Sequence, residues 1–178
     1  TSPDNRPVLL ILGGSQGSRQ INDLVFEALP ELAARCFVVH QTGPSETRNA
    51  AHANYRSFSY LGPELADVMA AADIVLSRAG ANVLWELAVL GKPSILIPLD
   101  LTGSRGDQIK NARYFADLGA SIVLSGQEVT TKHLFATLDR LLGNGEYLAA
   151  MSRAAAGACV KDAADVIARI LKENLTPS

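Results

Sequence analysis

A glycine-rich stretch follows the first apolar run of the sequence, and its residue types could bind an anion. The run VLLIL at 8–12 leads into GGSQG at 13–17, and an amphipathic stretch begins directly afterwards. Glycine permits positive φ and close approach of a ligand, while the N-terminus of a helix favours negative charge. The pattern matches neither the GxGxxG of dinucleotide folds nor the GxxxxGK[ST] of P-loops. A phosphate-binding loop and a purely structural turn therefore remain equally good interpretations.

A second stretch, SRAGANVLWE at 77–86, combines a small-residue loop with a carboxylate. The loop opens a predicted helix, and Glu86 lies about one and a half turns into it. A small-residue helix start can admit a pyrophosphate, and a carboxylate can accept hydrogen bonds from both hydroxyls of a ribose. The alternative is that Gly80 only lets the helix pack on the strand and that Glu86 is solvated. We expect Trp85, the only tryptophan, to lie in the core.

A third stretch, GSRGDQIKN at 103–111, brings polar side chains to the start of another predicted helix. Asp107, Gln108 and Asn111 could hydrogen-bond a polyhydroxylated ligand. The alternative is that Asp107 is an ordinary N-cap residue and that the other two are ordinary polar positions on the helix.

Complete residue sets for nucleophilic or metal-assisted hydrolysis are not recognisable in the sequence. GGSQG at 13–17 fits the letters of GxSxG, but none of the three histidines has a partner carboxylate at motif spacing. There is no HExxH pattern, and no cluster of Asp or Glu indicates a metal ion or another cofactor. His40 ends an apolar run and is either a buried, hydrogen-bonded polar residue or a ligand contact. We expect His52 and His133 on the surface. Cys36 and Cys159 have no CxxC spacing, so the sequence predicts neither a zinc site nor a disulfide and favours a reducing compartment.

Composition excludes several classes of function. The chain has 178 residues, 48% of them hydrophobic, which suits one well-packed domain. A formal net charge of -2, without a run of Lys or Arg, gives no indication of a basic surface that would bind nucleic acid. The longest apolar runs are much shorter than the roughly 20 residues of a membrane span.

Short apolar runs alternate with longer amphipathic stretches along the whole chain. Because parallel neighbouring strands need crossover helices, this alternation predicts an α/β domain with a doubly wound parallel sheet, Rossmann-like in class. In such sheets, ligands bind beyond the carboxyl ends of the strands near the switch in strand order, where the three loops above would lie. The predicted strands are 8–12, 36–40, 55–60, 73–77, 94–97 and 121–124, and the predicted helices are 18–35, 63–72, 81–90, 107–118, 131–142, 146–157 and 162–173.

Taken together, the motifs resemble one known family. The sequence contains, in order, LLILGGSQGSRQIN, FVVHQTG, ADIVLSRAGANVLWELAVLGKPSILIPL and GDQIKNARYFADLGA. This succession resembles the C-terminal half of MurG-type glycosyltransferases, over residues 8 to about 172. The resemblance implies a GT-B architecture of two doubly wound domains. Residues 8–175 would then form the nucleotide-sugar donor-binding domain, residues 1–7 a linker, and the acceptor domain would be absent from this chain.

The same resemblance implies which residues touch the donor, UDP-N-acetylglucosamine. The glycine loop would approach the diphosphate, the region around Leu61 would offer backbone groups to the uracil, and the loop at 78–82 would face the α-phosphate and the nucleoside. Glu86 would hold the ribose hydroxyls, and the pair at 107 and 108 would hydrogen-bond the sugar. The family usually has His or Gln at position 107. The implied set is Gly14, Ser15, Gln16, Leu61, Arg78, Ala79, Gly80, Ala81, Asn82, Glu86, Asp107 and Gln108.

The implied reaction is an inverting transfer of N-acetylglucosamine to undecaprenyl-diphospho-muramoyl-pentapeptide in peptidoglycan synthesis, at the cytoplasmic face of the membrane. The resemblance requires no metal and places the general base, the lipid-linked acceptor and the membrane contact on the absent domain. We therefore expect this chain alone to bind the donor with negligible turnover. The alternatives are a related transferase with another acceptor, such as diacylglycerol, a split-subunit transferase, or a non-catalytic sugar-nucleotide-binding module.

Overall fold

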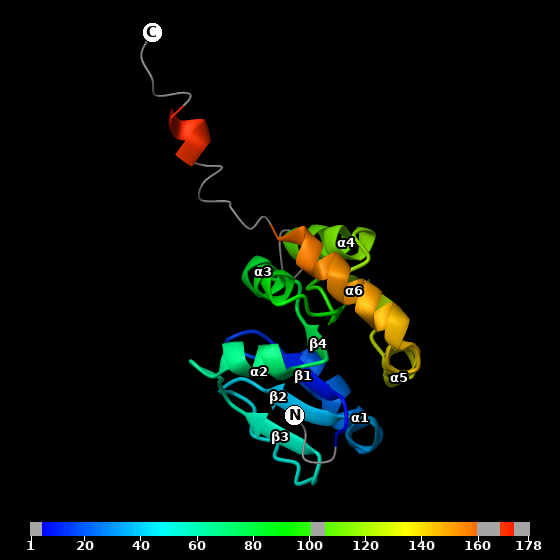
Figure 1. Ribbon diagram of the computed structural model, residues 1–178. Helices are drawn as coiled ribbons and strands as arrows, with labels where there is room; N and C mark the ends of the chain where they lie inside the picture. The colour runs from blue at the N-terminus through cyan, green and yellow to red at the C-terminus, as the bar shows by residue number, and fades with distance from the viewer. Residues whose placement is uncertain (1–4, 101–105, 160–167, 173–178) are drawn as a thin grey trace.

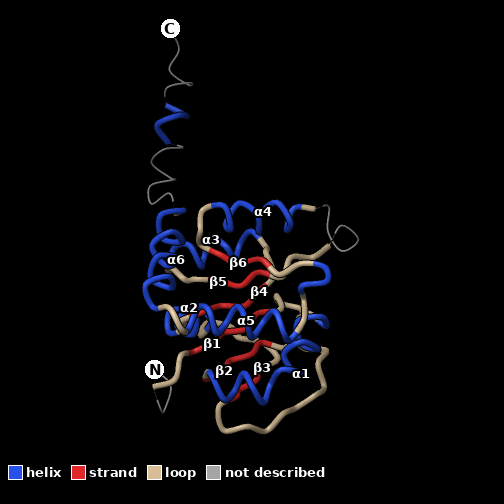
Figure 2. The backbone as a smooth tube through the Cα atoms, turned by 90° about the vertical axis from the view of Figure 1, so that its right-hand side faces the viewer, coloured by secondary structure: helices blue, strands red, loops and turns tan. Residues whose placement is uncertain are grey.

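The computed structural model describes residues 5–100, 106–159 and 168–172. Its centre is a six-stranded sheet in the order β3-β2-β1-β4-β5-β6, and every neighbouring pair is parallel. Figure 2 shows the strands one above another, with β6 uppermost and helices on both sides. The strands are β1 (Val8–Leu12), β2 (Phe37–Gln41), β3 (Tyr55–Phe58), β4 (Ile74–Ser77), β5 (Ser94–Leu96) and β6 (Ser121–Val123).

Helices connect the strands and cover the sheet (Figure 1). They are α1 (Arg19–Arg35), α2 (Leu65–Ala71), α3 (Ala81–Val89), α4 (Asp107–Asp117), α5 (Thr131–Leu142) and α6 (Gly145–Ala158), with a 3₁₀ turn at Gly126–Glu128. The predicted doubly wound α/β fold is therefore confirmed. Of the helix predicted at 162–173, residues 168–172 are helical and the rest lie outside the described residues.

Alternate residues of β1 pack into two different cores, as expected for a strand buried on both faces. Leu9 and Ile11 belong to a cluster with apolar residues of α1 and α5. Leu10 and Leu12 belong to another cluster, which includes Met69 of α2 and residues of α3. These strand residues are 0–4% exposed, so β1 is the buried centre of the sheet.

Trp85 does not lie in the core, contrary to the sequence-based expectation. Its side chain is 46% exposed on α3. The edge of its ring packs against Phe115 of α4, with ring centroids 5.7 Å apart and an interplanar angle of 71°. Leu84 and Leu87 take the buried positions of this helix instead, because they face the sheet.

The switch in strand order lies at β1. The chain builds β1, β2 and β3 in one direction, then returns to the other side of β1 as β4. Leu12 at the end of β1 is in register with Gln41 of β2 and with Ser77 of β4. The loops that follow these strands consequently leave the sheet side by side, and they diverge on either side of the switch.

The glycine loop after β1 is a tight turn packed on the loop after β2. Gly14 and Gly17 have positive φ of 89° and 77°, and the Gly17 N–H donates to the Gly14 carbonyl at 3.0 Å. A Cβ on Gly17 would overlap the Thr42 carbonyl oxygen and lie 2.9 Å from the Gly43 Cα, whereas a Cβ on Gly14 would meet nothing within 4 Å. Gly17 is therefore required by backbone packing, and Gly14 only by its dihedral angles.

This difference predicts unequal costs for two alanine substitutions. Gly14→Ala should lower the free energy of unfolding by about 1–2 kcal/mol, the cost of a left-handed non-glycine residue. Gly17→Ala should cost about 3 kcal/mol or more, because overpacking against rigid backbone adds to the same dihedral cost. Urea denaturation followed by circular dichroism measures both, and equal losses would contradict the packing argument.

Candidate functional site

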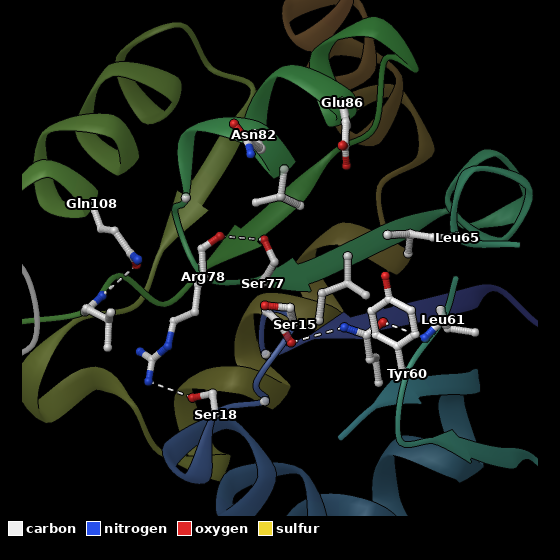
Figure 3. A pocket seen from close by; sticks show the side chains of 18 of the residues that line it. Ser15, Ser18, Tyr60, Leu61, Leu65, Ser77, Arg78, Asn82, Glu86 and Gln108 are labelled. Atoms are coloured by element: carbon white, nitrogen blue, oxygen red, sulfur yellow. Dashed lines mark hydrogen bonds between the residues drawn. The ribbon is translucent and has the colours of Figure 1, made fainter. Parts of the chain in front are cut away.

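A cleft of about 920 Å³ opens at the carboxyl ends of β1 and β4, beside the switch in strand order. Figure 3 shows Ser15 and Ser18 contributed by the segment after β1, Asn82 and Glu86 by α3, and Gln108 by α4. The lining consists of Leu12, Gly13, Gly14, Ser15, Gly17, Ser18, Arg19, Gln20, Gln41, Tyr60, Leu61, Gly62, Leu65, Met69, Ser77, Arg78, Gly80, Ala81, Asn82, Val83, Glu86, Leu99 and Gln108.

Most of the site residues predicted from the sequence line this one cleft, although they come from four separate loops and helix starts. The residues that do so are Gly14, Ser15, Leu61, Arg78, Gly80, Ala81, Asn82, Glu86 and Gln108. The fold therefore brings together segments that are more than 90 residues apart in the chain.

Gln16, Ala79 and Asp107 lie outside the lining of the cleft. Gln16 borders a separate depression beside Arg48. Ala79 is fully buried, and its carbonyl accepts a hydrogen bond from Asn111 Nδ2 at 3.1 Å. Asp107 is exposed in the first turn of α4. The interpretation of Asp107 as an N-cap is also wrong, because Gly106, with φ 82°, takes that position.

One amide at the N-terminus of α1 is already capped by a side chain of the protein. Ser18 is the N-cap, and its Oγ accepts from the Ile21 N–H at 3.4 Å. The same oxygen accepts from the Arg78 guanidinium at 2.7 Å. A ligand anion at this helix would therefore compete with an existing cap.

Arg78 joins three segments around the cleft. Besides Ser18, its guanidinium donates to Gln20 Oε1 at 2.9 Å and to the carbonyls of Ile97 and Pro98 at 3.0 and 3.4 Å. Burial lowers the pKa of this guanidinium from its usual value, and the charge of Asp100 acts in the opposite direction. These contacts of Arg78 are structural, and they fix the start of α1 against the segment that follows β5.

The N-termini of α3 and α4 differ from that of α1, because glycine occupies both N-cap positions. Neither Gly80 nor Gly106 can supply a side-chain cap. A Cβ on Gly80 would meet only Val83 Cγ1, at 3.9 Å, so no packing against the protein demands glycine there. Gly80, Ala81 and Asn82 line the cleft, so the start of α3 borders it, and first-turn amides of a helix are groups that can bind an anion.

Gln108 has a fixed amide orientation at the opposite side of the cleft. Its Oε1 accepts from the Leu99 N–H at 3.0 Å, as the dashed line in Figure 3 shows. The acceptor end of the amide is therefore used by the protein, and Nε2 carries the two N–H donors of this side chain.

Sequence reasoning missed several lining residues, among them Gln41 and Tyr60. Gln41 ends β2 and is 4% exposed, while the Tyr60 ring is 63% exposed beside Leu61 (Figure 3). Gln41 is the last residue of β2, and Tyr60 comes two residues after β3. The position of Gln41 at a strand end, inside the motif FVVHQTG, was a usable signal.

His40 lies beneath the loops rather than in the cleft. Its side chain is fully buried, with Nε2 3.1 Å from Asn22 Oδ1 and Nδ1 3.0 Å from the Tyr55 hydroxyl. Asn22 Nδ2 donates to the Thr42 carbonyl and to Glu46, so Oδ1 is an acceptor and Nε2 carries the proton. Of the two interpretations of His40, the buried hydrogen-bonded residue is confirmed.

Burial sets the charge state of this network. It lowers the pKa of His40 to about 4, while Glu46 and Arg48 act in opposite directions on it. The hydrogen bond from Arg48 is the main reason that the pKa of Glu46 falls to about 2. At neutral pH the network therefore contains a neutral imidazole and an ionised carboxylate, and Asn22 bonds to both.

Residues 5–100, 106–159 and 168–172 meet neither the requirements of a metal cluster nor those of a membrane-spanning helix. No group of three or more His, Cys, Asp or Glu there could hold a metal ion. None of the helices in those ranges is both long enough and apolar enough to cross a bilayer. Cys36 and Cys159 are free thiols.

A sequence profile of the glycosyltransferase family 28 C-terminal domain matches residues 8–167. A Clostridium botulinum (strain Kyoto / Type A2) protein is 41% identical over 172 residues, which is 95% of this chain and 49% of that protein. Its name is UDP-N-acetylglucosamine--N-acetylmuramyl-(pentapeptide) pyrophosphoryl-undecaprenol N-acetylglucosamine transferase. A protein of the same name from Geobacillus thermodenitrificans is 46% identical over 141 residues, which is 78% of this chain and 40% of that protein.

Among solved structures, the MurG of Acinetobacter baumannii has the same fold. It superposes with a TM-score of 0.80 at 24% identity, over 97% of this chain and 51% of that one. A putative UDP-N-acetylglucosamine 2-epimerase from Listeria monocytogenes superposes with a TM-score of 0.74 at 15% identity, over 99% of this chain and 46% of its own. This chain spans about half the length of the curated relatives it matches.

The His40 network predicts a specific pH dependence of stability. The unfolded chain binds a proton at His40 near its ordinary pKa of 6.5, but the folded protein does so only near 4. Its contribution is complete above pH 6.5 and is lost as the pH falls towards 4. Between pH 7 and 5 the free energy of unfolding should fall by about 2 kcal/mol from this residue.

Urea titrations at the two pH values measure this loss. His40→Gln should be less stable at pH 7, yet it should show a much smaller decrease on going to pH 5. The matched control His133→Gln, on exposed α5 surface, should keep the wild-type decrease. An equal decrease in His40→Gln and wild type would rule out His40 as its source.

Proposed function

The chain belongs to the family of glycosyltransferase family 28 C-terminal domains, and from that premise we propose that it binds the nucleotide-sugar donor of an N-acetylglucosaminyltransferase. The donor is UDP-N-acetylglucosamine, and the acceptor is a muramyl-pentapeptide carried on undecaprenyl diphosphate, as the names of the relatives suggest. One observation carries the proposal: the start of α3, which has no side-chain cap, opens into a cleft at the strand-order switch, with a carboxylate about one and a half turns further along.

The diphosphate is assigned to the start of α3. A helix N-terminus stabilises an exposed anion by about 0.3–1 kcal/mol and a partly buried one by up to ~2 kcal/mol. The α1 start is less available, because Ser18 already caps one of its amides. The glycine loop with Ser15 then forms the opposite wall around the phosphates.

The nucleoside is assigned to the side of the cleft between Leu61 and Glu86. Glu86 accepts hydrogen bonds from the ribose hydroxyls, and its carboxylate makes these bonds charge-assisted. The Leu61 N–H is already donated to Gln41 Oε1 at 2.9 Å, so the base must be read by other backbone groups of the 61–62 loop. Gln108, whose Nε2 carries two N–H donors, is assigned to the sugar.

The reaction is an inverting displacement. An acceptor hydroxyl attacks the anomeric carbon, the bond to the diphosphate oxygen breaks, and the transition state has oxocarbenium character. Negative charge grows on the departing UDP, and a preorganised donor aimed at such charge is worth roughly 3 kcal/mol. This chain stabilises the leaving group through its amides, while the acceptor, the general base and the contact with the cytoplasmic membrane face belong to a separate N-terminal half.

Calorimetry of the chain with UDP-N-acetylglucosamine, UDP-glucose and UDP tests the donor site directly. We expect heat from all three, and the absence of heat from every one would refute the proposed function. Glu86→Ala should weaken UDP binding by about 1.5–3 kcal/mol, the range for a charged hydrogen bond.

The ribose contact has a sharper control. The matched variant Glu27→Ala, on the exposed side of α1, should leave UDP affinity unchanged. Wild type should bind the 2′-deoxy analogue of UDP more weakly than UDP, and Glu86→Ala should lose most of that preference. A preference that survives in Glu86→Ala would remove Glu86 from the ribose.

The variant Gly80→Ala should change the affinity for UDP without a large change in the stability of the fold. Gly80 has φ -69°, which alanine adopts readily, and its added Cβ would meet only Val83 Cγ1 at 3.9 Å. The free energy of unfolding should change by less than about 1 kcal/mol. UDP should bind at least about tenfold more weakly, because a methyl group at the helix start holds the phosphate away from the amides. Unchanged UDP affinity would place the diphosphate elsewhere in the cleft.

A further inference from the structure

Gln41 spans the two loops that the proposed ligand would touch at opposite ends. It is the last residue of β2, and its side chain enters the cleft between the glycine loop and the loop after β3. Its Nε2 donates to the Gly14 carbonyl at 3.1 Å, and its Oε1 accepts from the Leu61 N–H at 2.9 Å. Figure 3 shows the dashed line that ends at Leu61, next to the Tyr60 ring.

Both bonds are made to backbone groups at the positions that set loop geometry. The Gly14 carbonyl also accepts from the Gly17 N–H and thereby closes the glycine turn. Leu61 is 5% exposed and belongs to the core cluster between the sheet and α2. One side-chain amide therefore fixes the distance between the tight turn and an anchored point of the second loop.

The flanking residues of β2 hold other partners, so this bridge has no duplicate among them. His40 points to the opposite face of the sheet and bonds to Asn22 and Tyr55. Thr42 bonds to the Phe58 carbonyl through its N–H and its hydroxyl. Gln41 is the residue of the three that reaches both walls of the cleft.

We infer that Gln41 is a positioning residue that sets the spacing between the phosphate wall and the base wall of the cleft. This rests on the proposed function, because the spacing matters only for a ligand with groups at both walls. A nucleoside diphosphate has such groups, and it gains affinity over its separate halves only when both walls stand at the matching distance. Loss of the bridge should therefore affect the joined ligand more than either half.

The test compares UDP with its halves, uridine and inorganic pyrophosphate, on the 178-residue chain. NMR titration gives the three dissociation constants for wild type, Gln41→Met and the matched control Thr42→Val, which alters the residue directly after β2. We expect Gln41→Met to bind UDP at least about tenfold more weakly while each half changes by less than about threefold. Thr42→Val should keep the wild-type ratio between UDP and its halves.

A second variant covers the case in which Gln41→Met does not fold. Gln41→Glu has the shape of glutamine, but when ionised it accepts only, so it keeps the Leu61 bond and repels the Gly14 carbonyl. Protonation restores a donor, and burial raises the pKa of such a carboxyl above its ordinary value. The UDP affinity of Gln41→Glu, relative to wild type at the same pH, should therefore recover as the pH is lowered from 8 to 5.

The outcomes distinguish a failure of the proposed function from a failure of the inference about Gln41. If wild type binds no UDP, the proposed function is refuted and the inference with it. If wild type binds UDP, the inference alone is overturned in either of two cases. One is that Gln41→Met weakens UDP no more than its halves. The other is that the relative affinity of Gln41→Glu does not change with pH.

Discussion

The parallel pairing of β1 with both β2 and β4 is the constraint on which the cleft depends. Because β1 is paired on each side and covered on each face, its five residues are apolar and buried. The register aligns Leu12 with Gln41 and Ser77, so three chain segments leave the sheet at one level. A one-residue slip would turn every side chain of β1 to the opposite core. The position at which the loops leave the sheet is therefore determined by the hydrophobic packing of β1 and not by contacts among the loops.

Much of this arrangement is readable from the sequence, because its signals are local. Apolar runs and amphipathic stretches give the strands and helices to within a few residues, and the ordered motifs place most lining residues at strand ends. Trp85 shows where local signals fail. Its residue type favours burial, but on α3 the inward positions belong to Leu84 and Leu87, and only the helix phase decides between them.

The failures at the site have a similar cause. The sequence names GGSQG as one unit, yet the turn between Gly14 and Gly17 directs Ser15 into the cleft and leaves Gln16 beside a different depression. Asp107 belongs to the N-cap residue types, but the chain enters α4 through a left-handed residue, and Gly106 takes that conformation more cheaply. Side-chain partners such as Gln41 for Leu61 depend on distances between strands, which no short motif encodes.

The helix starts around the cleft differ in whether the protein itself caps their amides. At the α1 start, Ser18 caps one amide, and the Arg78 cation beside it is directed to the protein's own oxygens. The α3 and α4 starts have glycine at the N-cap and therefore no side-chain cap there, and the α3 start lines the cleft. Amides on a rigid helix are oriented before the ligand arrives and need no rearrangement as its charge grows, whereas a flexible cation must be ordered first. A site built in this way suits a ligand whose negative charge increases during reaction, as it does on a diphosphate that is leaving a sugar.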